Sequence, residues 1–136
     1  MKYMLIMNTP RDGYTQYMNW PKKILEANIA FMQTFTQKLS EAGELVGTWG
    51  LASPEQASRV RAGKDGKPIT DGVFPESKEF LAGFWIVDVD SPERAYQIAA
   101  EASTAPGTSV KAPDGSTIDD LWIEVRAIMG SHEDMK

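Results

Sequence analysis

Residues 70–79 hold the densest group of chemically reactive side chains in the sequence. This segment, T-D-G-V-F-P-E-S-K-E, contains two carboxylates (Asp71 and Glu76), an ammonium group (Lys78) and the ring of Phe74. A carboxylate beside apolar walls has a raised pKa and can act as a general base. We therefore assign Asp71 as the candidate acid or base. The alternative is structural, because an Asp before a Gly commonly hydrogen-bonds its own backbone at a turn.

Side chains from other segments could complete a ligand site around Asp71. A guanidinium such as that of Arg59 can clamp a carboxylate, and Lys78 could anchor an anion unless it pairs with Glu76 on the surface. Trp49 and Trp85 could line a cleft for an aromatic molecule, although Trp more often packs in cores or interfaces. The predicted ligand-binding residues are therefore Trp49, Arg59, Phe74, Glu76, Lys78 and Trp85.

The composition disfavours several other kinds of partner. Zinc prefers His and Cys ligands, but the chain has one His (His132) and no Cys. Neither glycine-rich phosphate-binding motif occurs, and a net charge of −5 does not suit a phosphate backbone. No stretch approaches the roughly 20 apolar residues of a membrane helix. We predict no metal, no cofactor, no direct nucleic-acid or membrane contact and, from the absent cysteine, a cytoplasmic protein.

Periodicity predicts the strands that must position these residues. Residues 2–7 and 82–89 are apolar on both alternating faces, which is typical of strands covered on both sides. Further strands are predicted at 44–51 and 119–129. Residues 57–70 contain two short extended runs around a Gly-bounded loop and predict a hairpin, while residues 104–117 are rich in Gly, Pro and Ser and predict a loop.

Two helices are predicted between these strands. Residues 21–42 form a long amphipathic pattern that ends before Gly43, a favoured C-terminal stop. Ser91 and Pro92 supply an N-cap hydroxyl and a first-turn proline for the second helix. The predicted buried sides are Ile24, Ala27, Phe31, Phe35, Leu39 and Ala42 in the first helix, and Ala95, Ile98, Ala99 and Ala102 in the second.

The order of these elements predicts an α+β fold. Without the hairpin it is β-α-β-β-α-β, the pattern of a ferredoxin-like split βαβ sandwich. The length favours a single domain, which we place at residues 1–130 with a polar tail at 131–136. Two helices cover only one face of such a sheet, so the second apolar face predicts a homodimer. The alternative cover is the hairpin 57–70 together with the loop 104–117.

Several blocks of the sequence together suggest a known family: MKYMLI at 1–6, TDGVF at 70–74, ESKE at 76–79, LAGFWIVDVDS at 81–91 and IEVRAIM at 123–129. These blocks resemble the YCII-related family, and in particular its DGPF-motif branch of small bacterial proteins. The resemblance implies a ferredoxin-like fold of the dimeric α/β-barrel type. Two departures matter: D-G-P-F has become D-G-V-F, and the His–Asp pair of some relatives cannot form in its usual place because His132 lies in the tail.

These observations favour a small-molecule-binding or regulatory module and leave open whether the chain is an enzyme. One alternative is a cofactor-free lyase, isomerase or monooxygenase that acts on an aromatic or small organic acid with Asp71 as acid or base. Another, suggested by the resemblance, is an interaction partner in sigma-factor-linked transcription regulation. A deep cleft lined by Trp49, Arg59 and Asp71 would favour a ligand, and a filled sheet face without a pocket would favour a protein partner.

Overall fold

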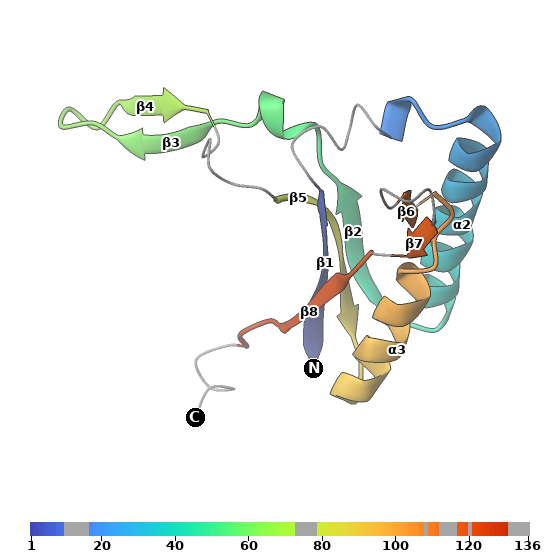
Figure 1. The fold of residues 1–136 in the computed structure, drawn as a ribbon. Coiled ribbons are helices and arrows are strands. Elements are labelled where there is room, and N and C mark those ends of the chain that lie inside the picture. The colour runs from blue at the N-terminus through green and yellow to red at the C-terminus, as the bar shows by residue number, and fades with distance from the viewer. Residues whose placement is uncertain (10–16, 73–78, 108, 112–116, 120, 131–136) are drawn as a thin grey trace.

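The computed structural model describes residues 1–9, 17–72, 79–107, 109–111, 117–119 and 121–130. Of the predicted site, Phe74, Glu76 and Lys78 lie outside the described residues, as does the tail 131–136 with His132. Figure 1 shows a central sheet, long helices that pack on one side of it and a hairpin that projects away at one end.

The central sheet has four strands: β1 (Lys2–Thr9), β2 (Leu45–Gly50), β5 (Phe80–Asp88) and β8 (Ile123–Ala127). Their spatial order is β2-β5-β1-β8, and each neighbouring pair is antiparallel. The two strands that are apolar on both faces, β1 and β5, thus occupy the centre. This order and the two helices confirm the predicted α+β, ferredoxin-like fold.

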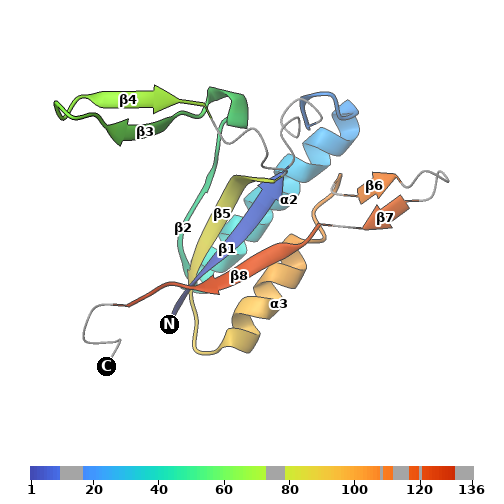
Figure 2. The ribbon, with the colours of Figure 1, turned by 60° about the vertical axis from the view of Figure 1, so that its left-hand side comes forward.

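Two helices, α2 (Lys22–Glu41) and α3 (Pro92–Ala102), pack on one face of the sheet (Figures 1 and 2). The Ser91 hydroxyl accepts a hydrogen bond from the backbone N–H of Arg94 at 3.2 Å, which confirms it as the N-cap of α3. The whole predicted inner side of α3 is buried, namely Ala95, Ile98, Ala99 and Ala102. Small residues there let α3 lie close to the sheet.

The core lies between this helix layer and the sheet. Leu5 of β1, Val87 of β5, Phe35 of α2 and Ile98 of α3 are its largest fully enclosed side chains. The ring of Phe35 meets the ring of Trp85 edge to face, with centroids 5.7 Å apart. The core therefore joins the C-terminal half of α2 to the middle of the sheet.

The predicted buried stripe of α2 holds only over that C-terminal half. Phe35 and Leu39 are buried and Phe31 packs partly against the core, but Ile24, Ala27 and Ala42 are exposed. The buried residue of the N-terminal half is Asn28, with 6% of its surface exposed. The prediction was wrong at Ile24 and Ala27 because the N-terminal half of α2 lies over a cavity and does not pack against the sheet, and at Ala42 because the helix ends at Glu41 with Ala42 as its C-cap.

Two small hairpins lie outside the central sheet. The first pairs β3 (Arg59–Ala62) with β4 (Pro68–Asp71), and it follows a short 3-10 turn, η1 (Pro54–Gln56). It confirms the hairpin predicted at 57–70. The second pairs β6 (Ser109–Lys111) with β7 (Thr117–Asp119), so the loop predicted at 104–117 was wrong in part. Because Asp119 pairs with Ser109, the last strand of the central sheet begins only at Ile123.

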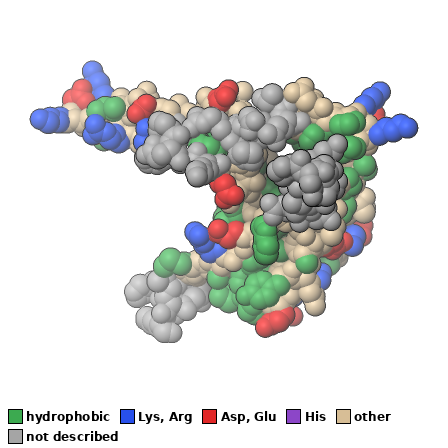
Figure 3. Space-filling model, viewed as in Figure 1, with side chains coloured by type: hydrophobic (Ala, Val, Ile, Leu, Met, Phe, Trp, Pro, Cys, Tyr) green, Lys and Arg blue, Asp and Glu red, His purple; other side chains and the backbone are tan. Residues whose placement is uncertain are grey.

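The second face of the sheet carries Met4, Ile6, Phe84 and Ile86, which are partly exposed and alternate with the core residues. Neither described hairpin lies over this face: β3–β4 extends outward beyond the end of the sheet, and β6–β7 lies on the helix side (Figure 1). The space-filling view shows a hollow below the projecting hairpin (Figure 3). In the described part of the chain no helix is long and apolar enough to span a membrane.

Candidate functional site: a cavity between α2 and the sheet

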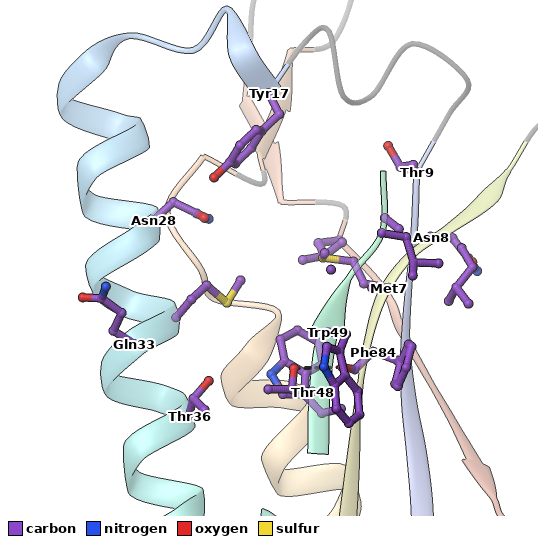
Figure 4. A pocket seen from close by; sticks show the side chains of 18 of the residues that line it. Met7, Asn8, Thr9, Tyr17, Asn28, Gln33, Thr36, Thr48, Trp49 and Phe84 are labelled. Carbon is purple, nitrogen blue, oxygen red and sulfur yellow. Dashed lines mark hydrogen bonds between the residues drawn. The ribbon is translucent and has the colours of Figure 1, made fainter. Parts of the chain in front are cut away.

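A cavity of about 1050 Å³ separates the N-terminal half of α2 from the ends of strands β1, β2 and β5. Its size is at the upper end of the usual range for small-molecule sites. Figure 4 shows its side chains, with Asn28 and Thr36 on α2 facing Thr48 and Met7 on the strands. The described lining also includes Tyr17 and Trp20, the segment Leu51 to Pro54, and the turn at Gly107.

The cavity exists because the residues that face it are too small or too polar to fill it. On α2, Asn28, Met32 and Thr36 continue toward the N-terminus the inner side that Leu39 occupies in the core. On β5, Gly83 presents no side chain, and a Cβ there would lie 3.1 Å from the carbonyl oxygen of Trp49. The close approach of the neighbouring strand favours a glycine at this position, and the missing side chain leaves space in the cavity beside Gly83.

Trp20 and Trp85 form the aromatic part of the wall, and Trp85 is held by its contact with Phe35. Trp49 also borders the cavity, but its side chain lies with that of Phe84 on the second face of the sheet, with ring centroids 5.8 Å apart and 62% of Trp49 exposed. Trp20 packs against the backbone at Gly107, where a Cβ would lie 2.5 Å from its ring. These contacts hold the rings in place, as a preformed site requires.

Asn28 links α2 to the turn after α3. Its Nδ2 donates a hydrogen bond of 2.8 Å to the carbonyl oxygen of Pro106. The neighbouring Gly107 has a φ of 87°, a conformation that favours glycine. This bond therefore fixes the position of the turn against which Trp20 packs.

The strongest ion pair of the described residues lies away from the cavity. The Arg94 guanidinium donates two hydrogen bonds of 2.7 Å to the Glu44 carboxylate, which joins the start of β2 to α3. These bonds lower the pKa of Glu44, and they raise the pKa of Arg94 above its usual value. The pair stabilises the core end of the fold and has no contact with a ligand space.

Asp71 and Arg59 meet each other on the projecting hairpin. Arg59 Nη2 donates to Asp71 Oδ2 at 2.9 Å, and Arg59 Nε donates to the carbonyl oxygen of Gly72. The other carboxylate oxygen of Asp71 accepts from the Gly72 N–H at 2.8 Å. With 77% of its side chain exposed, Asp71 has the geometry of the turn residue that was the alternative to a catalytic role.

The predicted site residues thus fall into separate places. Trp49 and Trp85 line the cavity, whereas Asp71 and Arg59 are not among its described lining residues. The predicted assembly of Trp49, Arg59 and Asp71 around one cleft is not what the structure brings together. The catalytic role of Asp71 stays a prediction, as do the ligand contacts of Phe74, Glu76 and Lys78.

Sequence reasoning missed the polar residues of the cavity wall, above all Asn28. A signal was present: Asn28 precedes Phe35 by seven residues and Leu39 by eleven, so all three lie on one helix face. A polar residue in phase with a buried stripe marks a place where the helix faces something other than a core. Among the described residues, no three His, Cys, Asp or Glu side chains gather as metal ligands would.

The fold and the cavity together define an α+β protein of ferredoxin-like topology with a half-open space between α2 and the sheet. The chain belongs to the YCII-related family, because the family model of the YCII-related domain matches residues 1–111. That stretch includes both helices, the hairpin β3–β4 and three of the four central strands.

The chain is also similar to "Uncharacterized protein R00369" of Rhizobium meliloti (strain 1021). The two sequences are 30% identical over 86 residues, which cover 63% of this chain and 69% of the relative. This similarity supports the family and adds no activity to it.

Proposed function

We propose that this protein is a small-molecule-binding or regulatory module whose ligand occupies the cavity between α2 and the sheet. The observation that carries the proposal is a half-open space of about 1050 Å³ with the rings of Trp20 and Trp85 in its wall. A space of this size lined by aromatic rings and a few polar groups is the usual form of a ligand site. Arg59 and Asp71, which pair on the hairpin, are not among the described residues that line it.

A cavity-filling substitution tests this proposal. A ligand that binds only the folded protein raises its melting temperature. A thermal-shift screen against aromatic metabolites measures this increase, with unfolding followed by circular dichroism. Thr36→Phe would place a ring in the cavity from α2, and we expect it to abolish the shift given by any hit. Thr34→Phe is the matched control, because Thr34 is exposed on the same helix and does not line the cavity.

Two results would count against a ligand in this cavity. One is a hit whose thermal shift persists unchanged in Thr36→Phe. The other is the absence of any hit from a broad library of neutral, anionic and cationic metabolites.

We also propose that two copies of the chain form a homodimer through the second face of the sheet. The support is a strip of partly exposed apolar residues on β1 and β5, namely Met4, Ile6, Phe84 and Ile86. The Glu124–Arg126 ion pair of β8 borders this strip, since Glu124 pairs with Ile6 and Arg126 with Met4. An apolar centre with a charged border is the usual composition of a protein interface.

Sedimentation velocity at micromolar concentration tests the dimer. We expect a particle of about 30 kDa, twice the 15.0 kDa of one chain, and a shift to the monomer in Ile86→Arg. Tyr96→Arg is the control, because Tyr96 is 56% exposed on α3, which packs on the opposite face. A monomer of the unmodified chain at this concentration would contradict the proposal.

Two narrower assignments rest on sequence features alone. The segment T-D-G-V-F at 70–74 supports a place in the DGPF-motif branch of the family, and the absence of cysteine supports a cytoplasmic location. Isolation of the protein from cell fractions would test the location directly.

A further inference from the structure

The charges around the cavity restrict the kind of ligand that fits it. Glu41 is the one charged residue among the described lining residues, and Gln37 Nε2 donates to its Oε1 at 3.0 Å. None of the described lining residues is Lys, Arg or His. An anion transferred from water into such a space would lose its hydration without gaining a cation, so the cavity disfavours carboxylates and phosphates.

The apolar part of the wall suits a flat, unsaturated molecule. Trp20 and Trp85 offer ring faces and edges, and Met7 and Met32 add polarisable thioethers that adapt to an aromatic surface. Thr36 and Thr48 project into the same space (Figure 4). The Thr48 hydroxyl already donates to the carbonyl oxygen of Phe84 at 2.9 Å, which leaves this group less free to donate to a ligand.

Asn28 supplies the most defined polar contact for such a molecule. Its amide is buried, and the bond from Nδ2 to the Pro106 carbonyl fixes which end of the amide is oxygen. No described residue donates to Oδ1, and no fully enclosed side-chain oxygen of the described part lacks a partner. This oxygen is therefore open to the cavity, toward which the side chain extends in Figure 4.

We infer that the cavity binds an uncharged aromatic molecule whose N–H or O–H group donates a hydrogen bond to Asn28 Oδ1. This inference rests on the proposed binding function and narrows the ligand class. An acceptor oxygen held in the cavity wall favours ligands that carry a hydrogen-bond donor over those that lack one, because a bound molecule without a donor leaves the oxygen without a partner. The absence of a cation among the described lining residues disfavours a carboxylate derivative of the same molecule.

Three matched probes test the inference by isothermal titration calorimetry on the full chain. Indole is neutral and has a donor, N-methylindole lacks the donor, and indole-3-carboxylate keeps the donor but adds a negative charge. We expect indole to bind about tenfold more tightly than N-methylindole, the value of one hydrogen bond. We expect indole-3-carboxylate to bind at least about a hundredfold more weakly than indole, because its charge is desolvated without a partner.

The variant Asn28→Leu separates the hydrogen bond from a structural effect. A damaged cavity would weaken indole and N-methylindole alike, whereas loss of the acceptor brings the ratio of their affinities to about one. If this variant does not fold, the side-chain amide signal of Asn28 in the unmodified chain gives the answer by nuclear magnetic resonance. It shifts on addition of indole and stays in place with N-methylindole if Asn28 is the anchor.

The outcomes distinguish this inference from the broader proposal. Binding of indole-3-carboxylate as tight as that of indole would overturn the inference and leave the ligand cavity intact. Equal affinities of indole and N-methylindole for the unmodified chain would overturn the role of Asn28. Failure of all three probes, together with a metabolite library without hits, would overturn the binding function itself.

Discussion

The hairpin β3–β4 and the cavity under α2 hold their polar groups in opposite ways. On the hairpin, Asp71 and Arg59 carry full charges, but they neutralise each other in water and 77% of the Asp71 side chain is exposed. In the cavity, Asn28 carries no charge, yet it is buried and keeps one oxygen open. We expect this difference to favour the cavity as a ligand site, because partly buried space with a few polar groups suits a ligand better than a dense group of exposed charges.

The two regions also differ in how they are supported. The cavity wall continues the main core through Trp85 and Phe35, whereas Val60 and Ile69 of the hairpin remain 62% and 44% exposed. An isolated two-stranded hairpin is marginally stable in water. Matched substitutions in the two regions therefore test whether the core and the hairpin contribute as differently to stability as their burial indicates.

The largest contrast is expected between Phe35→Ala and Val60→Ala. Phe35 has 2% of its surface exposed and packs on Trp85, so its truncation should reduce the free energy of unfolding by about 3–5 kcal/mol. The same measurement on Val60→Ala, by urea denaturation, should change it by less than about 0.5 kcal/mol. Equal losses would show that the hairpin is packed in solution, for example against a second copy.

A glycine pair gives the next contrast. Gly107 and Gly66 both have a positive φ, 87° and 80°, so an Ala at either position costs about 1 kcal/mol in backbone strain. A Cβ at Gly107 would also overlap the ring of Trp20, whereas a Cβ at Gly66 has nothing within 4 Å.

We therefore expect Gly107→Ala to lose about 2 kcal/mol of unfolding free energy, measured by thermal denaturation, and Gly66→Ala to lose about half of that. Gly107→Ala should also weaken any cavity ligand, because Trp20 must move. A Gly107→Ala protein with unchanged ligand affinity would exclude Trp20 from the binding wall.

The two ion pairs give the third contrast, with the same chemistry at different burial. The side chain of Glu44 is 17% exposed and that of Asp71 is 77% exposed. Glu44→Gln should cost about 1 kcal/mol at neutral pH, while Asp71→Asn should have almost no effect on unfolding, because exposed pairs are screened by water. Chemical denaturation of both variants measures the difference.

The pH dependence of the Glu44 effect has a defined sign. Because Arg94 holds the pKa of Glu44 below its usual 4.5, the pair stabilises the protein fully above about pH 4.5. This contribution disappears as the pH falls through the lowered pKa. The stability gap between the unmodified chain and Glu44→Gln should therefore close in acid, and a gap that persists at the lowest pH would point to packing instead of charge.

The elements that depend on local signals were the most predictable part of the fold. Ser91 and Pro92 start α3, and the small residues of its inner side are buried as their spacing indicates. The hairpin register even pairs Arg59 with Asp71, so their ion pair follows from the predicted hairpin. The sequence analysis predicts the hairpin but assigns Arg59 and Asp71 to a ligand site instead of to an ion pair across its strands.

The remaining features depend on distances that a sequence pattern does not contain. Periodicity indicates which side of α2 faces inward, but it cannot give the separation between the helix and the sheet near Asn28. The strands β6 and β7 have three residues each, too few for an alternating pattern to distinguish them from a loop. The position of the cavity was therefore not predicted from the sequence, although two residues that border it, Trp49 and Trp85, were predicted to bind a ligand.

The distribution of the four tryptophans has an optical consequence. Trp85 is only 4% exposed in the cavity wall, whereas Trp49 and Trp122 are 62% and 84% exposed. A water-soluble quencher should therefore suppress the emission of Trp49 and Trp122 long before that of Trp85. What remains of the ultraviolet fluorescence comes largely from the cavity wall, so the protein reports the filling of its own cavity without an attached label.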